Sequence, residues 1–137
     1  MTGETDLSKL LTSMQPLLQP GEYVFCSIPA QTSYSPSLDP MGCFKEEEGL
    51  TLILSRQQAD EVGLPYDAVF AMITLAVHSS LEAVGFLAAI ATHLASHGIS
   101  VNPVSAFYHD HLFVPAAQAE RAIALLEALS QANHDAP

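Results

Sequence analysis

The clearest structural pattern of this 137-residue chain lies in residues 70–129, FAMITLAVHSSLEAVGFLAAIATHLASHGISVNPVSAFYHDHLFVPAAQAERAIALLEAL. Its apolar periodicity and turn residues predict, in order, a strand, a helix, two strands and a helix, over residues 70–77, 79–97, 101–108, 111–114 and those after Pro115. A tight turn at His109-Asp110 joins the second and third strands. The stretch therefore predicts a β-α-β-β-α unit.

This order of elements is typical of a ferredoxin-like sheet, in which the third strand lies between the first two and both helices cover one face. The first two strands then point the same way. The loop after Val77 and the turn at His109 are therefore expected at the same end of the sheet. No strand is predicted after the last helix, so a fourth strand must come from the N-terminal half or from another chain.

The N-terminal half predicts a second, related unit. Leu7, Leu10, Leu11 and Met14 recur at helical spacing after a cap at Thr5 or Asp6. Strands are predicted at 22–28, 41–45 and 50–54, and a helix follows the cap at Ser55. Both halves end in β-β-α, which predicts two α+β domains, 1–66 (lacking its first strand) and 67–137.

The segment HSSLEAVG, residues 78–85, is the strongest candidate for a binding site. It joins a strand to a helix, and the spacing of Ser79 and Glu82 predicts a capping box at the start of that helix. Free amides and the macrodipole at a helix N-terminus attract a carboxylate. Gly85 within the first turns favours close approach of a ligand or another backbone. An ordinary capped helix explains the same residues without a ligand.

Three blocks of the chain resemble a small bacterial family of tandem ACT-domain proteins. They are FKEEEGLTLIL, the stretch from ITLAVHSSLEAVGF to AFYHDHLFVP, and TDLSKLLTSMQPLLQPGEYVFCSI. More distantly, the second half is similar to tandem ACT proteins that sense amino acids. The resemblance implies an α+β, ferredoxin-like ACT fold with antiparallel sheets covered by helices on one face. It also implies side-by-side pairing, hence a homodimer, and a regulatory function without catalytic residues or cofactors.

ACT domains bind amino acids near the strand-to-helix loop, so the resemblance implies a site for an amino acid or similar small zwitterion. It places the following residues at that site: Ser79, Ser80, Leu81, Glu82, Ala83, Val84 and Gly85. Because this loop is expected to meet the hairpin, His78, His109 and Asp110 are also expected at the site.

Composition narrows the range of partners. Four Lys and Arg face fifteen Asp and Glu, which gives a net charge of -11. Such a surface repels phosphate backbones and anionic lipids, so neither nucleic acid nor membrane is an expected partner. The first residues show no basic start followed by an apolar stretch, and the two cysteines form no Cys-x-x-Cys motif. A cytoplasmic location is therefore expected.

Two alternatives stay open at this stage. Instead of a regulatory module that binds an amino acid, the first alternative is a structural or partner-binding module whose site is empty. The second is a metal-binding protein that uses His78, His109, Asp110 and His111. Imidazole and carboxylate suit zinc or nickel, but nothing in the spacing of these residues requires that they come together. No motif of a nucleophilic, nucleotide-binding or zinc enzyme is present, so we expect no catalytic activity.

Overall fold

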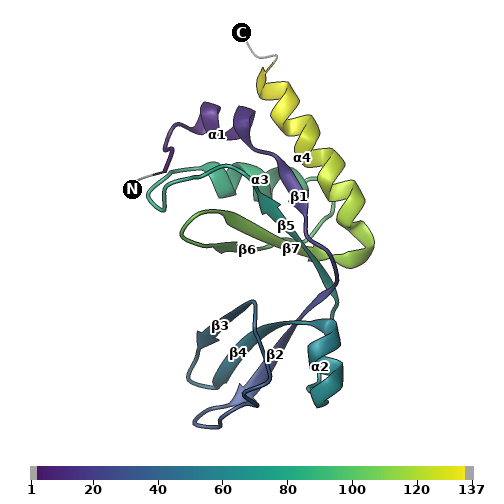
Figure 1. Ribbon diagram of the computed structural model, residues 1–137. Coiled ribbons are helices and arrows are strands. Elements are labelled where there is room, and N and C mark those ends of the chain that lie inside the picture. The colour runs from purple at the N-terminus through teal and green to yellow at the C-terminus, as the bar shows by residue number, and fades with distance from the viewer. Residues whose placement is uncertain (1–2, 135–137) are drawn as a thin grey trace. The chain divides into compact units, whose positions relative to one another are not determined.

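The computed structural model describes residues 3–134, whose contacts divide the chain into two compact units (Figure 1). Unit 1 combines the residues up to Pro20 with those from Ala71 onward, and unit 2 runs from Gly21 to Phe70. The spatial units thus interleave along the sequence, because the first twenty residues pack with the second half of the chain.

Unit 1 contains the predicted β-α-β-β-α order. Its strands are β1 (Pro16–Leu18), β5 (Phe70–Leu75), β6 (Asn102–Ser105) and β7 (Asp110–Pro115). They follow the spatial order β1-β5-β7-β6, so β7, the third strand of the predicted β-α-β-β-α order, lies between β5 and β6, as predicted.

The fourth strand of unit 1 comes from the N-terminal half of the chain. β1 pairs antiparallel with β5, with Leu17 opposite Thr74. Of the two sources left open by the sequence, the structure selects this one. The strand itself was not predicted, because Pro16 and Pro20 indicate a break in regular structure. A proline is nevertheless compatible with the first residue of an edge strand, where its missing N–H breaks no ladder bond.

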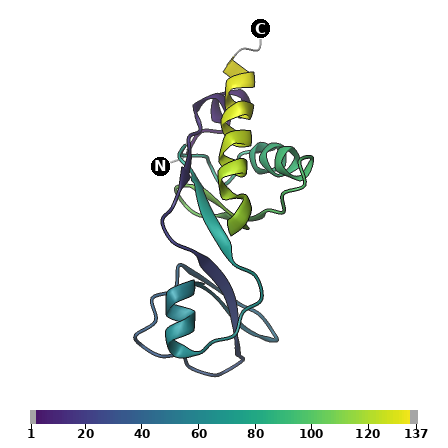
Figure 2. The ribbon, with the colours of Figure 1, turned by 90° about the vertical axis from the view of Figure 1, so that its right-hand side faces the viewer.

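Three helices of unit 1 bury their apolar stripes against one face of this sheet (Figures 1 and 2). They are α1 (Leu7–Ser13), α3 (Phe86–Ala95) and α4 (Ala119–His134), the last preceded by a short 3-10 helix, Ala116–Gln118. The fully buried side chains from this core include Leu10, Ile73, Leu75, Ile90, Leu94, Leu112 and Leu126. Within residues 3–134, no helix is both long and apolar enough to cross a lipid bilayer.

Unit 2 is a three-stranded antiparallel sheet with one helix. Its strands β2 (Tyr23–Pro29), β3 (Gly42–Lys45) and β4 (Gly49–Ser55) lie in the order β3-β4-β2. The Ser55 side chain accepts from the amide of Gln58 and starts α2 (Arg56–Val62), as the sequence predicted. Its buried core consists of Val24, Cys26, Ile28, Leu38, Leu52, Leu54 and Ala59.

The hairpin between β6 and β7 differs from the prediction. The turn was placed at His109-Asp110, but the amide of Ala106 donates to the carbonyl of His109 at 3.0 Å, and Asp110 already belongs to β7. Phe107 and Tyr108 therefore form the tip, where they are 59% and 60% exposed. The prediction failed because aromatic residues favour strands, so the sequence pattern extends β6 through residues that belong to the turn.

A chain of hydrogen bonds links Gln19, which follows β1, to β5 and β7 in unit 1. The Nε2 group of Gln19 donates to Thr74 Oγ1 at 2.9 Å, and Thr74 Oγ1 lies 2.9 Å from His111 Nδ1. With Gln19 donating, the Thr74 hydroxyl is directed to donate to a neutral His111 ring. Burial, reinforced by nearby His109, lowers the pKa of His111 below its ordinary value of 6.5.

We expect His111 to make the unfolding free energy depend on pH. A lowered pKa in the folded state means that the unfolded chain binds the proton more tightly. The contribution of His111 is therefore fully present above a pH of about 6.5 and is lost as pH falls through the lowered folded-state pKa. His111→Asn keeps an acceptor for Thr74 and should flatten this dependence in denaturant unfolding, whereas the exposed control His97→Asn should not. Equal slopes for wild type and His111→Asn would contradict this expectation.

Candidate functional site

The loop after β5 meets the β6–β7 hairpin at one end of the unit 1 sheet. The hydroxyl of Ser79 donates to Asp110 Oδ2 at 2.9 Å, and both residues are buried. His109 Nδ1 lies 3.4 Å from the carbonyl oxygen of Val77, to which it donates. The rings of His78 and Tyr108 are 5.5 Å apart. These contacts confirm that HSSLEAVG and YHDH are neighbours.

The predicted capping box is wrong. The helix α3 begins at Phe86 rather than at Ser79, and its N-cap is Gly85, with φ of 90°. The Ser79 hydroxyl is engaged by Asp110, while the Ser80 hydroxyl accepts from the amide of Glu82 at 3.1 Å and closes a local turn. Gly85 is thus needed for its left-handed backbone, which other residues rarely adopt, rather than for close packing inside a helix.

The late start of the helix leaves a cavity of about 120 Å³ between the loop, the first turn of α3 and the hairpin. Six predicted site residues line it: Ser79, Ser80, Leu81, Ala83, Gly85 and Asp110. Four residues that the sequence did not suggest complete the lining: Phe86, Leu87, Ala88 and Ser105. The other four predicted residues lie outside the lining: His78, Glu82, Val84 and His109.

The cavity brings together two groups of opposite electrostatic character. The carboxylate of Asp110 is 6% exposed and lines one wall. The first turn of α3 lines another, and no side chain caps its N-terminus. The first intrahelical bond runs from the amide of Ala89 to the carbonyl of Gly85 at 2.9 Å, so the three preceding amides have no intrahelical acceptor. The cavity therefore offers an anionic group and the positive end of a helix dipole.

The site loop is held by a segment that sequence reasoning missed. The amide of Glu4 donates to the carbonyl of His78 at 2.8 Å, and the amide of Ser80 donates to the carbonyl of Glu4 at 2.9 Å. A Cβ added to Gly3 would lie 2.7 Å from backbone atoms of residues 78–80. This parallel bridge fixes the loop beside the cavity. Two residues in extended conformation carry no periodic signal, so the sequence pattern gave no indication of it.

We expect Gly3→Ala to displace the site loop, because real Cβ atoms do not approach backbone at this distance. Amide resonances of residues 78–80 should shift and their hydrogen exchange should accelerate in NMR spectra. Thr5→Ala, at an exposed neighbouring position, is the control. Unchanged resonances at residues 78–80 in Gly3→Ala would show that Gly3 does not pack against the loop.

The histidines do not gather into a metal site. Among residues 3–134, no three His, Cys, Asp or Glu side chains form a group that could hold a metal ion. His111 contacts Thr74, and His109 contacts Val77. His109 lies in the turn before β7 and His111 lies within β7, and their rings have different neighbours, so the alternative based on a histidine cluster lacks its geometry.

The sheet order, the helices on one face and the cavity at a strand-to-helix loop define an α+β, ferredoxin-like module. Two family models, each described as an ACT domain, match residues 2–71 and 68–128. The chain therefore belongs to the ACT domain family and contains two ACT domains in tandem. The resemblance and the fold class expected from the sequence are both confirmed.

Solved structures agree with this assignment. A protein of unknown function from Vibrio cholerae, described as a possible transport protein, is 48% identical, with a TM-score of 0.82 over 91% of this chain and 96% of its own. A protein from Agrobacterium tumefaciens shares 17% identity and a TM-score of 0.72, over 85% and 89% of the two chains.

A third similar structure is the ligand-free regulatory subunit of aspartate kinase from Thermus thermophilus. It shares 10% identity and a TM-score of 0.63, over 87% of this chain and 97% of its own, which shows a common fold. No curated protein sequence matches the chain significantly.

Proposed function

We propose that this chain is a regulatory module that binds an amino acid or a similar small zwitterion in the cavity at the start of α3. This proposal rests on one observation: the buried Asp110 carboxylate and a helix N-terminus without a side-chain cap line the same cavity. An α-amino acid carries an ammonium and a carboxylate on adjacent positions. Asp110 would accept from the ammonium, and the amides of Phe86 and Leu87 would donate to the carboxylate.

The size of the cavity supports a small ligand. Its volume of about 120 Å³ is well below the roughly 300–1,000 Å³ of pockets for larger ligands. Nothing in the lining offers a positive side chain, because it consists of serine, alanine, glycine, apolar residues and Asp110. We therefore place the smallest neutral amino acids first among the candidates.

The proposed module acts without catalysis. The hydroxyl of Ser79 donates to Asp110, and His109 donates to a backbone carbonyl, so these residues are not arranged as a nucleophile and its base. The fold shared with a regulatory subunit of aspartate kinase is consistent with a regulatory function. A cytoplasmic location remains the expectation from sequence.

A homodimer is part of the proposal. β6 forms the edge of the unit 1 sheet, and all four of its residues are exposed. Such an edge offers unpaired backbone groups to another strand, and the exposed Phe107 and Tyr108 adjoin it. Light scattering coupled to gel filtration should give the mass of a dimer. A monomer at every concentration would exclude this part of the proposal.

Thermal-shift screening of the twenty amino acids tests the binding function. A ligand that binds only the folded state raises stability by mass action, so at least one small amino acid should raise the Tm at millimolar concentration. No shift with any of the twenty would overturn the proposal. Together with a tightly co-purifying protein, that result would favour a partner-binding module, which the exposed Leu81 and Val84 beside the cavity also suit.

A further inference from the structure

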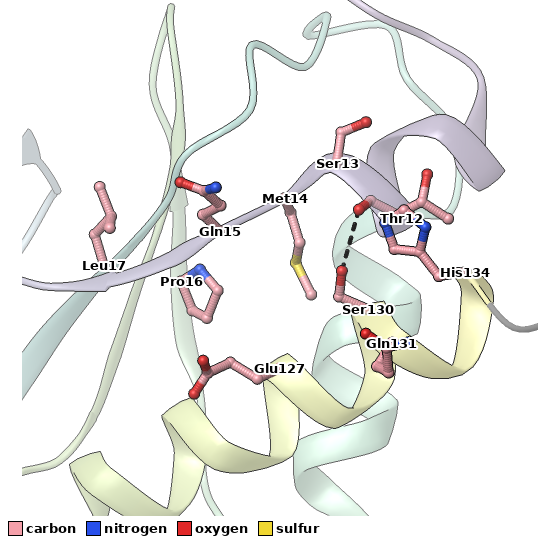
Figure 3. A pocket seen from close by; sticks show the side chains of 10 residues that line it. All are labelled: Thr12, Ser13, Met14, Gln15, Pro16, Leu17, Glu127, Ser130, Gln131 and His134. Atoms are coloured by element: carbon pink, nitrogen blue, oxygen red, sulfur yellow. Dashed lines mark hydrogen bonds between the residues drawn. The ribbon is translucent and has the colours of Figure 1, made fainter.

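The last helix of the chain carries a polar stripe that the proposed amino-acid site does not use. Glu127, Ser130, Gln131 and His134 recur at i, i+3, i+4 and i+7 on α4. Polar residues at this spacing usually form the solvated face of a helix. Here the end of α1 and the start of β1 lie across the stripe and enclose a groove of about 510 Å³ (Figure 3).

The groove has an anionic group at one end. Glu127 lies near Pro16 in Figure 3, and its carboxylate makes no hydrogen bond or ion pair with another residue among those described. No lysine or arginine lines the groove. A cationic ligand therefore meets a free carboxylate there and no competing positive charge.

The other end of the groove offers backbone oxygens. α1 ends at Ser13, and the carbonyls of its last turn carry the negative end of the helix dipole. The carbonyl of Thr12 accepts from the Ser130 hydroxyl at 3.2 Å, which fixes the end of α1 against α4. His134 lies beside Thr12 in Figure 3 and adds a ring nitrogen.

The middle of the groove is apolar on the side of the α1–β1 segment, whereas Ser130 and Gln131 line it on the side of α4. Met14 and Pro16 point from the chain segment toward α4 between the two polar ends (Figure 3). Glu127 and His134 are seven positions apart on α4, which corresponds to about 10 Å along the helix axis. The groove thus presents two electronegative ends, separated by a short stretch with an apolar wall on the side of Pro16 and a polar wall on α4.

We propose that this groove binds a short aliphatic diamine, with one ammonium on Glu127, the other at the carbonyl end of α1 and the methylenes over Pro16. Alkyl ammonium groups are charged at neutral pH, as lysine is. The occupant would hold the α1–β1 connection against α4. This site is separate from the cavity at the start of α3 and does not depend on the proposed function.

NMR titration of the full-length protein with 1,5-diaminopentane tests the proposal. Amide resonances of residues 12–17 and 127–134 should shift saturably at low millimolar concentration, and the uncharged 1,5-pentanediol should leave them unchanged. Glu127→Gln should weaken binding about tenfold, the effect of losing one charge-assisted hydrogen bond. Glu120→Gln removes the same charge from an exposed position of the same helix and should have no effect.

Three results would each overturn the proposal. The first is the absence of saturable shifts. The second is an equal weakening by Glu127→Gln and Glu120→Gln, which would mean that the diamine responds only to the acidic surface. The third is a set of shifts confined to residues 79–88 and Asp110. Binding that persists in Asp110→Asn separates this groove from the amino-acid site.

Discussion

Replacing Leu10 by alanine is expected to lower the free energy of unfolding by about 3 kcal/mol, within the range of roughly 2–5 kcal/mol for buried leucines. Leu10 lies on α1, is 0% exposed and belongs to the core that contains Ile90 of α3 and Leu126 of α4. Its removal leaves a cavity in a core assembled from both halves of the sequence. The measurement is denaturant unfolding monitored by circular dichroism.

Leu7→Ala is the matched control for this prediction. Leu7 lies on the same helix but is 37% exposed, so truncation should cost much less. Equal destabilisation by the two variants would mean that α1 does not contribute to the core of unit 1. The assignment of the N-terminal residues to unit 1 would then be wrong.

Replacing Asp110 by asparagine is expected to weaken binding of the most stabilising amino acid by about ten- to a hundredfold. A charge-assisted hydrogen bond contributes roughly 1.5–3 kcal/mol, and about 1.4 kcal/mol corresponds to a factor of ten in Kd. Asparagine keeps an acceptor for the Ser79 hydroxyl and removes only the charge. Isothermal titration calorimetry gives the change in affinity.

Two controls make this result specific. Asp67→Asn removes the same charge from an exposed position in unit 2 and should leave Kd unchanged. The deaminated analogue of the ligand, which keeps the carboxylate, should not bind more weakly to Asp110→Asn than to wild type. If the substitution weakened both ligands equally, Asp110 would not contact the ammonium.

Much of the fold was predictable because its signals are local and periodic. The strand before Val77, the long helix that follows and the order β-α-β-β-α all came from apolar spacing, and the position of β7 between β5 and β6 followed from the rules of strand connection. The strand β1 was not predictable, since Pro16 indicates a break and only pairing with β5 makes the segment a strand.

The site was predictable in its location and less so in its details. The meeting of the loop with Asp110 followed from topology. The capping box failed because the Ser79 hydroxyl bonds to Asp110, thirty-one residues away, rather than to the nearby amide of Glu82. The bridge through Gly3 and Glu4 depends on contacts distant in sequence, which no local pattern reveals.

An NMR titration of the full-length protein with the most stabilising amino acid tests whether the ligand occupies the cavity at the start of α3. The amides of Phe86, Leu87 and Ser79 should shift saturably, because they surround the proposed positions of the carboxylate and the ammonium. Resonances of the groove beside Glu127 should stay in place. Saturable shifts elsewhere, or none at residues 79–88, would contradict the account.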